Sequence, residues 1–379
     1  MATSARSVQP GILANARNRL SRWISHQSRP RRGRPDLCIN LALQGGGSHG
    51  AFTWGVLDRL LEEEQIGYEG ISGASAGAMN AVVMASGFLN GGHQGARSAL
   101  HAFWQSVSQA AHMGPLQPTP LEYLISGWNR DWSPSYLLLR AMAKLASPYQ
   151  INPTGFNALI PLLEKHVDFE ALRTTKKLKL FVAVTNLHSG MLRLLRNHEL
   201  SPRGLAASAC LPLLFHAVEL DGEYYWDGGY SANPALSPLL FECRSRDLLM
   251  VQLSPLRHEQ VPKQISDIID RAGEISFNAG FLRELQMLAM MQDSAGSGLL
   301  NPIRRTLHRL NLHQIHTEGA LAEFGKTSRI NAEWPFLQYL RDMGRNQADE
   351  WLRASGKALG RRSSLDLSQF RVERSADPH

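Results

Sequence analysis

Mainly apolar runs bounded by glycine alternate along the chain with segments in which apolar residues recur at helical spacing. The run at 37–43 is nearly continuous, as expected for a strand buried on both faces of a parallel sheet. The pattern predicts strands over residues 37–43, 68–72, 178–184, 191–195, 248–253 and 312–316, and helices over residues 50–64, 76–88 and 260–291. Strands that alternate with helices indicate an α/β fold, here a three-layer α/β/α sandwich around a mostly parallel central sheet.

A glycine-rich turn closes the second predicted strand. Residues 73–77 read Gly-Ala-Ser-Ala-Gly, which is the G-x-S-x-G spacing of a nucleophile elbow. The flanking glycines, Gly73 and Gly77, let a strand turn sharply into a helix and leave the serine hydroxyl exposed. Ser75 is therefore the candidate nucleophile.

Another glycine-rich turn closes the first predicted strand. Residues 45–50 read Gly-Gly-Gly-Ser-His-Gly and place consecutive backbone N–H groups at the start of the next helix. Unpaired amides and the helix dipole favour a developing negative charge at such a place. We expect an oxyanion hole formed by Gly45, Gly46, Gly47 and Ser48.

A serine hydroxyl is a poor nucleophile until a base accepts its proton. Asp227, which is followed by two glycines, is the candidate base. Asp221 is the nearest alternative, but Asp221-Gly222 is a turn signal at a place where a β-hairpin is expected. Asp227 can also be interpreted as a turn residue before its two glycines.

Taken together, G-G-G-x-x-G, then G-x-S-x-G and a distant D-G-G resemble the pattern of patatin-like phospholipases. Smaller features of the resemblance, which spans roughly residues 37–355, are Val-Asp-Phe-Glu at 167–170, the small-residue stretch at 206–212 and Ser-Phe-Asn at 276–278. The chain departs from the family at His49, where arginine or lysine is usual.

The resemblance implies a serine lipid acyl hydrolase of the phospholipase A, lysophospholipase or esterase type. It would cleave carboxylic esters through a dyad of Ser75 and Asp227 and an acyl-enzyme. The expected substrate is a phospholipid, a lysophospholipid or a neutral ester. The expected chemistry needs no cofactor and no metal ion.

Other functions fit parts of the pattern. The turn at 45–50 also matches the dinucleotide fingerprint, with Glu69 as the acidic residue, but this acid precedes the end of its strand. An α/β-hydrolase would use Ser75, Asp227 and His258 in that chain order, although the two glycine turns stand closer together than is normal for that fold. A non-catalytic lipid-binding scaffold at a membrane surface would not need all three motifs.

The composition is that of a globular enzyme. The chain has 379 residues, of which 43% are apolar and 19% are charged. It contains no run of about 18 apolar residues and no apolar core of a secretory signal near its start. The three cysteines, Cys38, Cys210 and Cys243, are few and far apart, and we interpret them as reduced packing residues. We therefore expect a cytoplasmic protein.

The positive charge is concentrated at the N-terminus. Eight arginines precede Asp36 with no acidic residue among them, although the whole chain has a formal net charge of only +7. Leu13, Ala16, Leu20 and Trp23 recur at helical spacing among these arginines, which predicts a basic amphipathic helix able to contact an anionic membrane, here the inner membrane. A disordered solubilising arm and an organellar transit peptide are the alternatives. No recognised module for nucleic acids accompanies the arginines, so we expect no nucleic-acid partner.

The pattern divides the chain into three parts. Residues 1–35 form the basic arm, residues 36–358 the catalytic domain with its C-terminal helices, and residues 359–379 a polar tail expected to be disordered. Within the domain, seven prolines interrupt residues 114–161. We expect this segment to be a lid beside the acyl pocket or an irregular packing insertion. The oligomeric state is left open.

Overall fold

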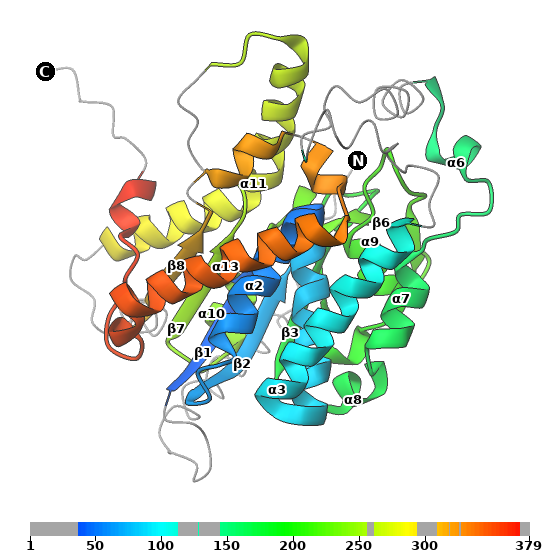
Figure 1. Cartoon of the computed structure of the whole chain (residues 1–379). Helices are drawn as coiled ribbons and strands as arrows, with labels where there is room; N and C mark the ends of the chain where they lie inside the picture. The colour runs from blue at the N-terminus through cyan, green and yellow to red at the C-terminus, as the bar shows by residue number, and fades with distance from the viewer. Residues whose placement is uncertain are drawn as a thin grey trace, which may run out of the picture.

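The computed structural model describes residues 37–112, 128, 145–255, 261–293, 309–317, 319–325 and 327–371. The basic arm at 1–35, most of the segment at 114–161 and His258 lie outside the described residues. Figure 1 shows a sheet with helices on both of its faces.

The described residues form an eight-stranded mixed sheet. The strands are β1 (Leu37–Leu43), β2 (Ile66–Gly73), β3 (Lys179–Asn186), β4 (Leu192–Arg196), β5 (Val218–Leu220), β6 (Glu223–Asp227), β7 (Asp247–Gln252) and β8 (Asn311–His316). The parallel part has the order β8-β7-β1-β2-β3, and β4 and β6 pair with β3 in antiparallel fashion. The six strands predicted from the sequence are confirmed to within two residues at each end, and the expected hairpin at Asp221 is formed by β5 and β6.

Helices cover the two faces of the sheet. The helices are α2 (Gly50–Leu60), α3 (Ala76–His112), α6 (Pro148–Ile151), α7 (Leu159–His166), α8 (Phe169–Thr174), α9 (Pro202–Ser208), α10 (Ser237–Glu242), α11 (Ile265–Asp293) and α13 (Trp334–Ser355). Short 3-10 turns are η1 (Gly47–His49), η2 (Asn197–Glu199), η3 (Gly228–Tyr230), η4 (Ala320–Phe324), η5 (Thr327–Ile330), η6 (Gly356–Ala358) and η7 (Leu367–Phe370).

Strand β1 shows how the layers arise. Its alternate residues Ile39, Leu41 and Leu43 join the apolar core under α2, α3 and α13, whereas Ala42 joins a second core with α10 and α11. Side chains of a strand point alternately to opposite faces, so an apolar run needs cover on both. The predicted three-layer α/β/α sandwich is confirmed.

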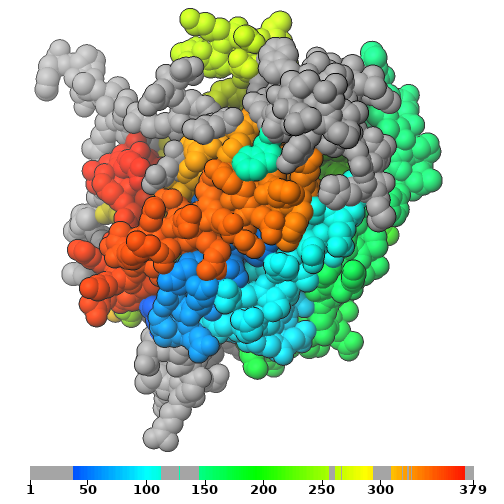
Figure 2. Space-filling model, in the orientation of Figure 1, coloured from blue at the N-terminus to red at the C-terminus, as the bar shows by residue number. Residues whose placement is uncertain are grey.

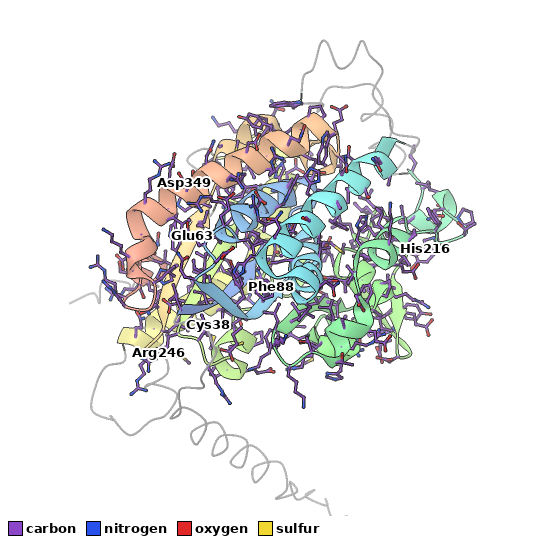
Figure 3. All side chains as sticks on the ribbon, turned by 60° about the horizontal axis from the view of Figure 1, so that its bottom comes forward. Cys38, Glu63, Phe88, His216, Arg246 and Asp349 are labelled. Atoms are coloured by element: carbon purple, nitrogen blue, oxygen red, sulfur yellow. The ribbon has the colours of Figure 1, made fainter. Side chains whose placement is uncertain are left out.

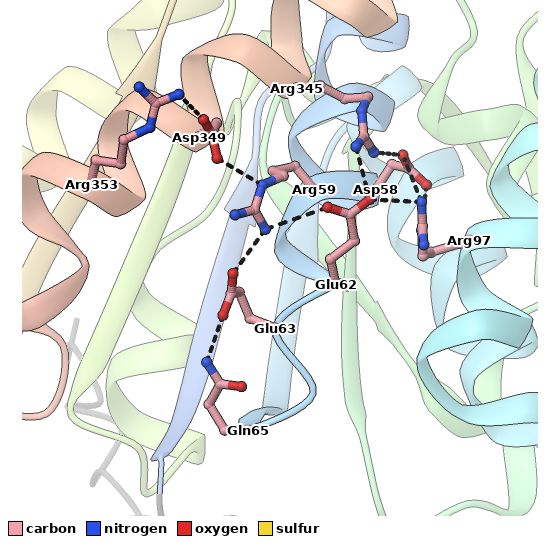
Figure 4. A network of polar contacts seen from close by, with 9 residues as sticks. All are labelled: Asp58, Arg59, Glu62, Glu63, Gln65, Arg97, Arg345, Asp349 and Arg353. Atoms are coloured by element: carbon pink, nitrogen blue, oxygen red, sulfur yellow. Dashed lines mark hydrogen bonds and ion pairs between the residues drawn. The ribbon is translucent and has the colours of Figure 1, made fainter.

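Helix α13 lies across α2, with α3 beside them (Figure 2). The crossing is close because Gly55 of α2 and Gly344 of α13 each face the backbone of the other helix, where a Cβ atom would clash. Charged side chains border the crossing (Figure 4): Arg97 of α3 binds Asp58 at 2.8 Å, and Arg59 binds Asp349 of α13 at 3.0 Å. Such a network fixes the three helices near the surface, and each of these partly buried pairs contributes on the order of 1 kcal/mol.

The helix predicted over 76–88 ends near the predicted residue, because Gly91 and Gly92 have non-helical backbone angles, with a φ of 58° at Gly92, and divide α3 into two helices. One expectation from the sequence needs correction. The tail is not disordered over residues 359–371, because Leu367 and Phe370 are buried against α11.

Candidate active site

The nucleophile elbow lies between β2 and α3. Ser75 has a φ of 51°, a left-handed conformation that costs a non-glycine residue about 1–2 kcal/mol. The turn is tight because a Cβ atom at Gly73 would lie 2.6 Å from the carbonyl carbon of Gly77, and one at Gly77 would strike the Leu43 carbonyl. Ser75 N–H donates to the backbone oxygen of Ser208 at 3.1 Å and to its hydroxyl at 3.0 Å. Ser208 therefore holds the strained backbone of the elbow through two hydrogen bonds.

The glycine turn at 45–50 packs directly on this elbow. A Cβ atom at Gly45 would lie 2.5 Å from Ala74 O and 2.8 Å from Ser75 Cβ. Gly47 has a φ of 61°, and its Cα faces the Arg329 carbonyl so closely that a side chain would clash there. Glycine is required at both positions, because only glycine allows these close approaches.

Gly45 does not offer its amide to a substrate. Its N–H donates to Asn233 Oδ1 at 2.7 Å, and Asn233 Nδ2 donates back to Gly45 O at 3.4 Å. This correction to the predicted oxyanion hole leaves Gly46, Gly47 and Ser48 as candidate donors. Asn233 is 2% exposed and follows η3, so the loop that carries the candidate base holds the glycine turn.

Asp227 is the last residue of β6 and is 1% exposed. Its Oδ1 accepts from Gly229 N at 2.8 Å, and its buried Oδ2 accepts no hydrogen bond within the described part of the chain. Burial raises the pKa of Asp227 to about 7, and the Gly229 N–H and the Ser75 hydroxyl partly oppose this rise. The fold thus brings the Ser75 hydroxyl close enough to the Asp227 carboxyl to affect its pKa, although the two groups do not form a well-aligned hydrogen bond.

Asp221, the alternative base, is a turn residue. It has a φ of 55° between β5 and β6, its side chain is 78% exposed, and it pairs with Arg193 at 2.7 Å. It lies in the hairpin expected from the sequence and takes no part in the site.

His49 is neutral in the folded protein. Its Nε2 lies 2.7 Å from Ser328 Oγ, and that hydroxyl donates its only proton to Gly325 O at 2.6 Å, so His49 Nε2 is the donor. Burial, with a further effect of the Arg329 charge, lowers the pKa of His49 to about 3. His49 therefore brings no positive charge to the glycine turn but ties it to η5.

Helix α11 contacts the site through Phe277 and Asn278. Gln44 Nε2 donates to Asn278 Oδ1 at 2.8 Å, while Gln44 Oε1 accepts from the backbone N–H groups of Leu253 and Ser254 at 2.6 and 2.9 Å. Phe277 packs against Gly229, where a Cβ atom would lie too close to the ring. The Ser-Phe-Asn string at 276–278 therefore contacts the turns on either side of the candidate dyad.

Several of these supporting residues were missed from the sequence. Ser208 lies in the small-residue stretch at 206–212, which was noted without a role, and Asn233 stands six positions after Asp227 with no local motif of its own. Both act through contacts with residues far away in the chain. Their roles become visible only when the distant segments of the chain are brought together in the fold.

The rival interpretations fare differently. Glu69 of β2 is 4% exposed and accepts from the backbone N–H groups of Arg244 and Ser245, each at 2.8 Å, so it is occupied within the sheet and cannot bind a ribose. His258 lies outside the described residues. Within the described ranges, no group of three or more His, Cys, Asp or Glu side chains is placed to hold a metal ion. Cys38, Cys210 and Cys243 are not joined in disulfide bonds.

Comparisons with solved structures find weak similarities. A solved structure of VipD from Legionella pneumophila is similar with a TM-score of 0.40 and 17% identity over 86% of this chain and 69% of VipD. ExoU, crystallised with SpcU from the type III secretion system of Pseudomonas aeruginosa, gives a TM-score of 0.25 and 15% identity over 89% of this chain and 76% of that one. Similarities this weak carry no argument about substrate or partners.

A search of curated proteins finds no match to the sequence. The family model described as patatin-like phospholipase matches residues 41–240, just over half of the chain. That match includes the glycine turn, the elbow and Asp227. The chain belongs to the patatin-like phospholipase family.

Proposed function

We propose that this protein is a serine lipid acyl hydrolase that cleaves carboxylic esters through Ser75 and Asp227. The observation that carries the proposal is the buried Asp227 carboxyl, which has an unpartnered oxygen and lies beside the hydroxyl of a serine on a strained elbow. A carboxyl with a pKa of about 7 is a far better base near neutral pH than an ordinary aspartate.

In the proposed reaction, Ser75 Oγ attacks the ester carbonyl while Asp227 accepts the hydroxyl proton. The alcohol leaves with that proton, and an acyl-serine remains. A water molecule, deprotonated by the same carboxylate, then attacks the acyl carbon and regenerates Ser75.

The amides of Gly46, Gly47 and Ser48 are the proposed donors to the oxyanion. Gly46 is partly exposed and Gly47 is exposed, so both can reach a bound ester. Each donor of this kind contributes about 3 kcal/mol to the transition state. The Gly45–Asn233 pair contributes by holding the turn against the elbow.

Contact with a membrane is a separate part of the proposal. Within the described part of the chain, no helix is both long and apolar enough to cross a bilayer. We propose that the basic arm at 1–35 binds an anionic membrane surface on the cytoplasmic side, where a lipid substrate would be available. Flotation of full-length protein and a variant lacking 1–35 with anionic vesicles tests this; equal binding would refute a role of the arm.

The catalytic proposal is tested by hydrolysis of a chromogenic ester series from short to long acyl chains. Ser75→Ala and Asp227→Asn should each lower kcat/KM by at least about 1000-fold. Asp221→Asn, the matched control on the exposed hairpin, should retain the wild-type rate. Normal turnover in Ser75→Ala would refute the nucleophile, and an inactive wild type over the whole series would favour a lipid-binding scaffold.

A further inference from the structure

A serine, a histidine and an aspartate outside the first site lie in contact near the amino ends of β7 and the edge strand β8. His313 of β8 has its Nε2 3.0 Å from Asp247 Oδ1, at the start of β7, and its Nδ1 2.9 Å from Ser364 Oγ. Figure 3 brings this edge forward and labels Arg246, the neighbour of Asp247, beside Cys38 at the start of β1. Ser75, in contrast, follows the carboxyl end of β2.

The contact with Asp247 decides the tautomer of a neutral His313. A carboxylate only accepts, so Nε2 is the donor to Asp247. In that neutral tautomer Nδ1 has a free lone pair and can accept from the Ser364 hydroxyl. This is the arrangement of a nucleophile, a base and a group that orients the base.

The histidine and aspartate are rigidly held, while the serine is open to solvent. Asp247 Oδ1 also accepts from Asn311 Nδ2 at 3.1 Å and from Gly360 N at 2.8 Å, which holds the carboxylate in place. His313 is 0% exposed, with Trp351 against its ring, and Ser364 is exposed. A reagent can therefore reach the hydroxyl but not the base.

Neighbouring serines lack this arrangement. Ser363 Oγ accepts from Leu312 N at 3.0 Å and lies 3.4 Å from Leu310 O, and Ser368 Oγ donates to Asp366 at 2.6 Å. Neither contacts a histidine in these bonds. They provide matched controls for Ser364 only a few residues away.

The backbone around Ser364 offers little to an oxyanion. The N–H groups of Ser364 and Leu365 both donate to Leu312 O at 3.0 Å, because this segment lies along the edge strand β8. Without preorganised donors a nucleophile can form a covalent adduct but gains little rate for repeated turnover.

We propose that Ser364 is a second reactive serine, activated by His313 and Asp247, that forms stoichiometric covalent adducts with electrophilic phosphonyl or activated acyl groups. With a phosphonyl fluoride, Ser364 Oγ forms the bond to phosphorus and the phosphorus–fluorine bond breaks. Fluoride leaves, and the hydroxyl proton passes to His313 Nδ1 and then to water.

The test uses the full-length chain with Ser75→Ala, so that the first site cannot react. The protein is treated with a fluorophosphonate probe and cleaved with trypsin, which releases residues 363–371 as one peptide that holds Ser363, Ser364 and Ser368. Fragmentation of this peptide locates the adduct. We expect Ser364 to carry at least about ten times more adduct than either other serine, since only its hydroxyl donates to a base of this kind.

An adduct on Ser364 no greater than on Ser363 and Ser368 would overturn the proposal. His313→Gln, checked for folding by its thermal unfolding, should abolish the adduct; persistence of the adduct in folded His313→Gln would also overturn it. If that variant does not fold, the comparison within the peptide decides alone. Labelling of Ser75 in the wild-type chain is read separately, so failure of one site is not confused with failure of the other.

Discussion

The two serine sites differ in place and in surroundings: Ser75 follows the carboxyl end of the inner strand β2, whereas Ser364 contacts His313 near the amino end of the edge strand β8. Ser75 sits on a strained elbow with a glycine turn against it and a carboxyl as direct neighbour. Ser364 has a histidine and an aspartate in good hydrogen-bond geometry, but its backbone is not left-handed and the nearby amides are already paired. The two sites therefore differ most in the supply of free backbone amides that could face a developing oxyanion.

The aspartates differ as well. Asp247 accepts three hydrogen bonds on Oδ1, from a histidine, an asparagine and a backbone amide. Asp227 accepts one, has a buried free oxygen, and its pKa is raised to about 7 by burial. The Asp247 carboxylate is fixed by its three donors and can only orient His313, whereas the Asp227 carboxyl keeps one oxygen open to accept a proton.

The largest expected difference between Asp227 and Asp247 is in how their substitution changes the free energy of unfolding at pH 8. Between the ordinary aspartate pKa of 3.8 and about 7, folded Asp227 holds a proton that the unfolded chain has lost, so its contribution to the free energy of unfolding falls as the pH rises through this window. Asp227→Asn removes this cost and should raise the free energy of unfolding by up to about 4 kcal/mol at pH 8, with no gain at pH 3. Urea unfolding at the two pH values measures this.

Asp247→Asn is the counterpart and should lower the free energy of unfolding by about 1–3 kcal/mol, because three donors lose a charged acceptor. Equal effects of the two substitutions would break the distinction between a carboxyl open to accept a proton and a carboxylate fixed by its donors.

The two hydrogen bonds between Asn233 and Gly45, which clamp the glycine turn, should matter for turnover at the first site alone. Asn233→Ala frees both polar groups of Gly45 and should lower kcat by about 10- to 100-fold, with less change in KM, because the oxyanion donors lose their position. Asn311→Ala removes a matched amide from the second site and should leave kcat unchanged. Steady-state kinetics of both variants decides, and an unchanged kcat in Asn233→Ala would contradict the role of the clamp.

Backbone strain should produce a smaller difference between Ser75 and Ser364, in the stability of their glycine and alanine variants. Ser75→Gly should be more stable than Ser75→Ala by about 1 kcal/mol, because glycine adopts a φ of 51° without strain. At Ser364 the glycine variant should be no more stable than the alanine variant. Thermal unfolding of the four proteins checks both, and a more stable Ser75→Ala would argue against strain in the elbow.

Removal of metal ions should have the smallest effect. In the proposed reaction the nucleophile, base and oxyanion donors are all protein groups, so ester hydrolysis should proceed at an unchanged rate in EDTA. Loss of activity that calcium restores would overturn this part of the proposal.

Local pattern predicted the elements and the chemistry that short motifs encode. The strand at 37–43 coincides with β1, and the elbow at Ser75 and the turn at Asp221 adopt the positive φ angles that their motifs require. The ordered end of the chain was missed because Leu367 and Phe370 stand among polar residues and only the surface of α11 gives them a partner.

The contacts between distant segments were beyond the sequence. Asn233 and Gly45 are 188 residues apart, and His313 lies 66 residues after Asp247 and 51 before Ser364. The contact of His313 with Asp247 follows from the order of the strands, which places β8 beside β7. No local propensity encodes that order.

The central claim is that a carboxyl, without a histidine, activates Ser75, and the temperature dependence of the kinetic pKa tests it most directly. The pH profile of kcat/KM for a soluble ester reports the base of the free enzyme. Carboxyl ionisation has an enthalpy near zero, whereas imidazole ionisation is strongly endothermic. The account predicts a rise in kcat/KM with a midpoint near pH 7 that stays in place on warming; a midpoint that moves to lower pH on warming would identify a histidine and contradict the dyad.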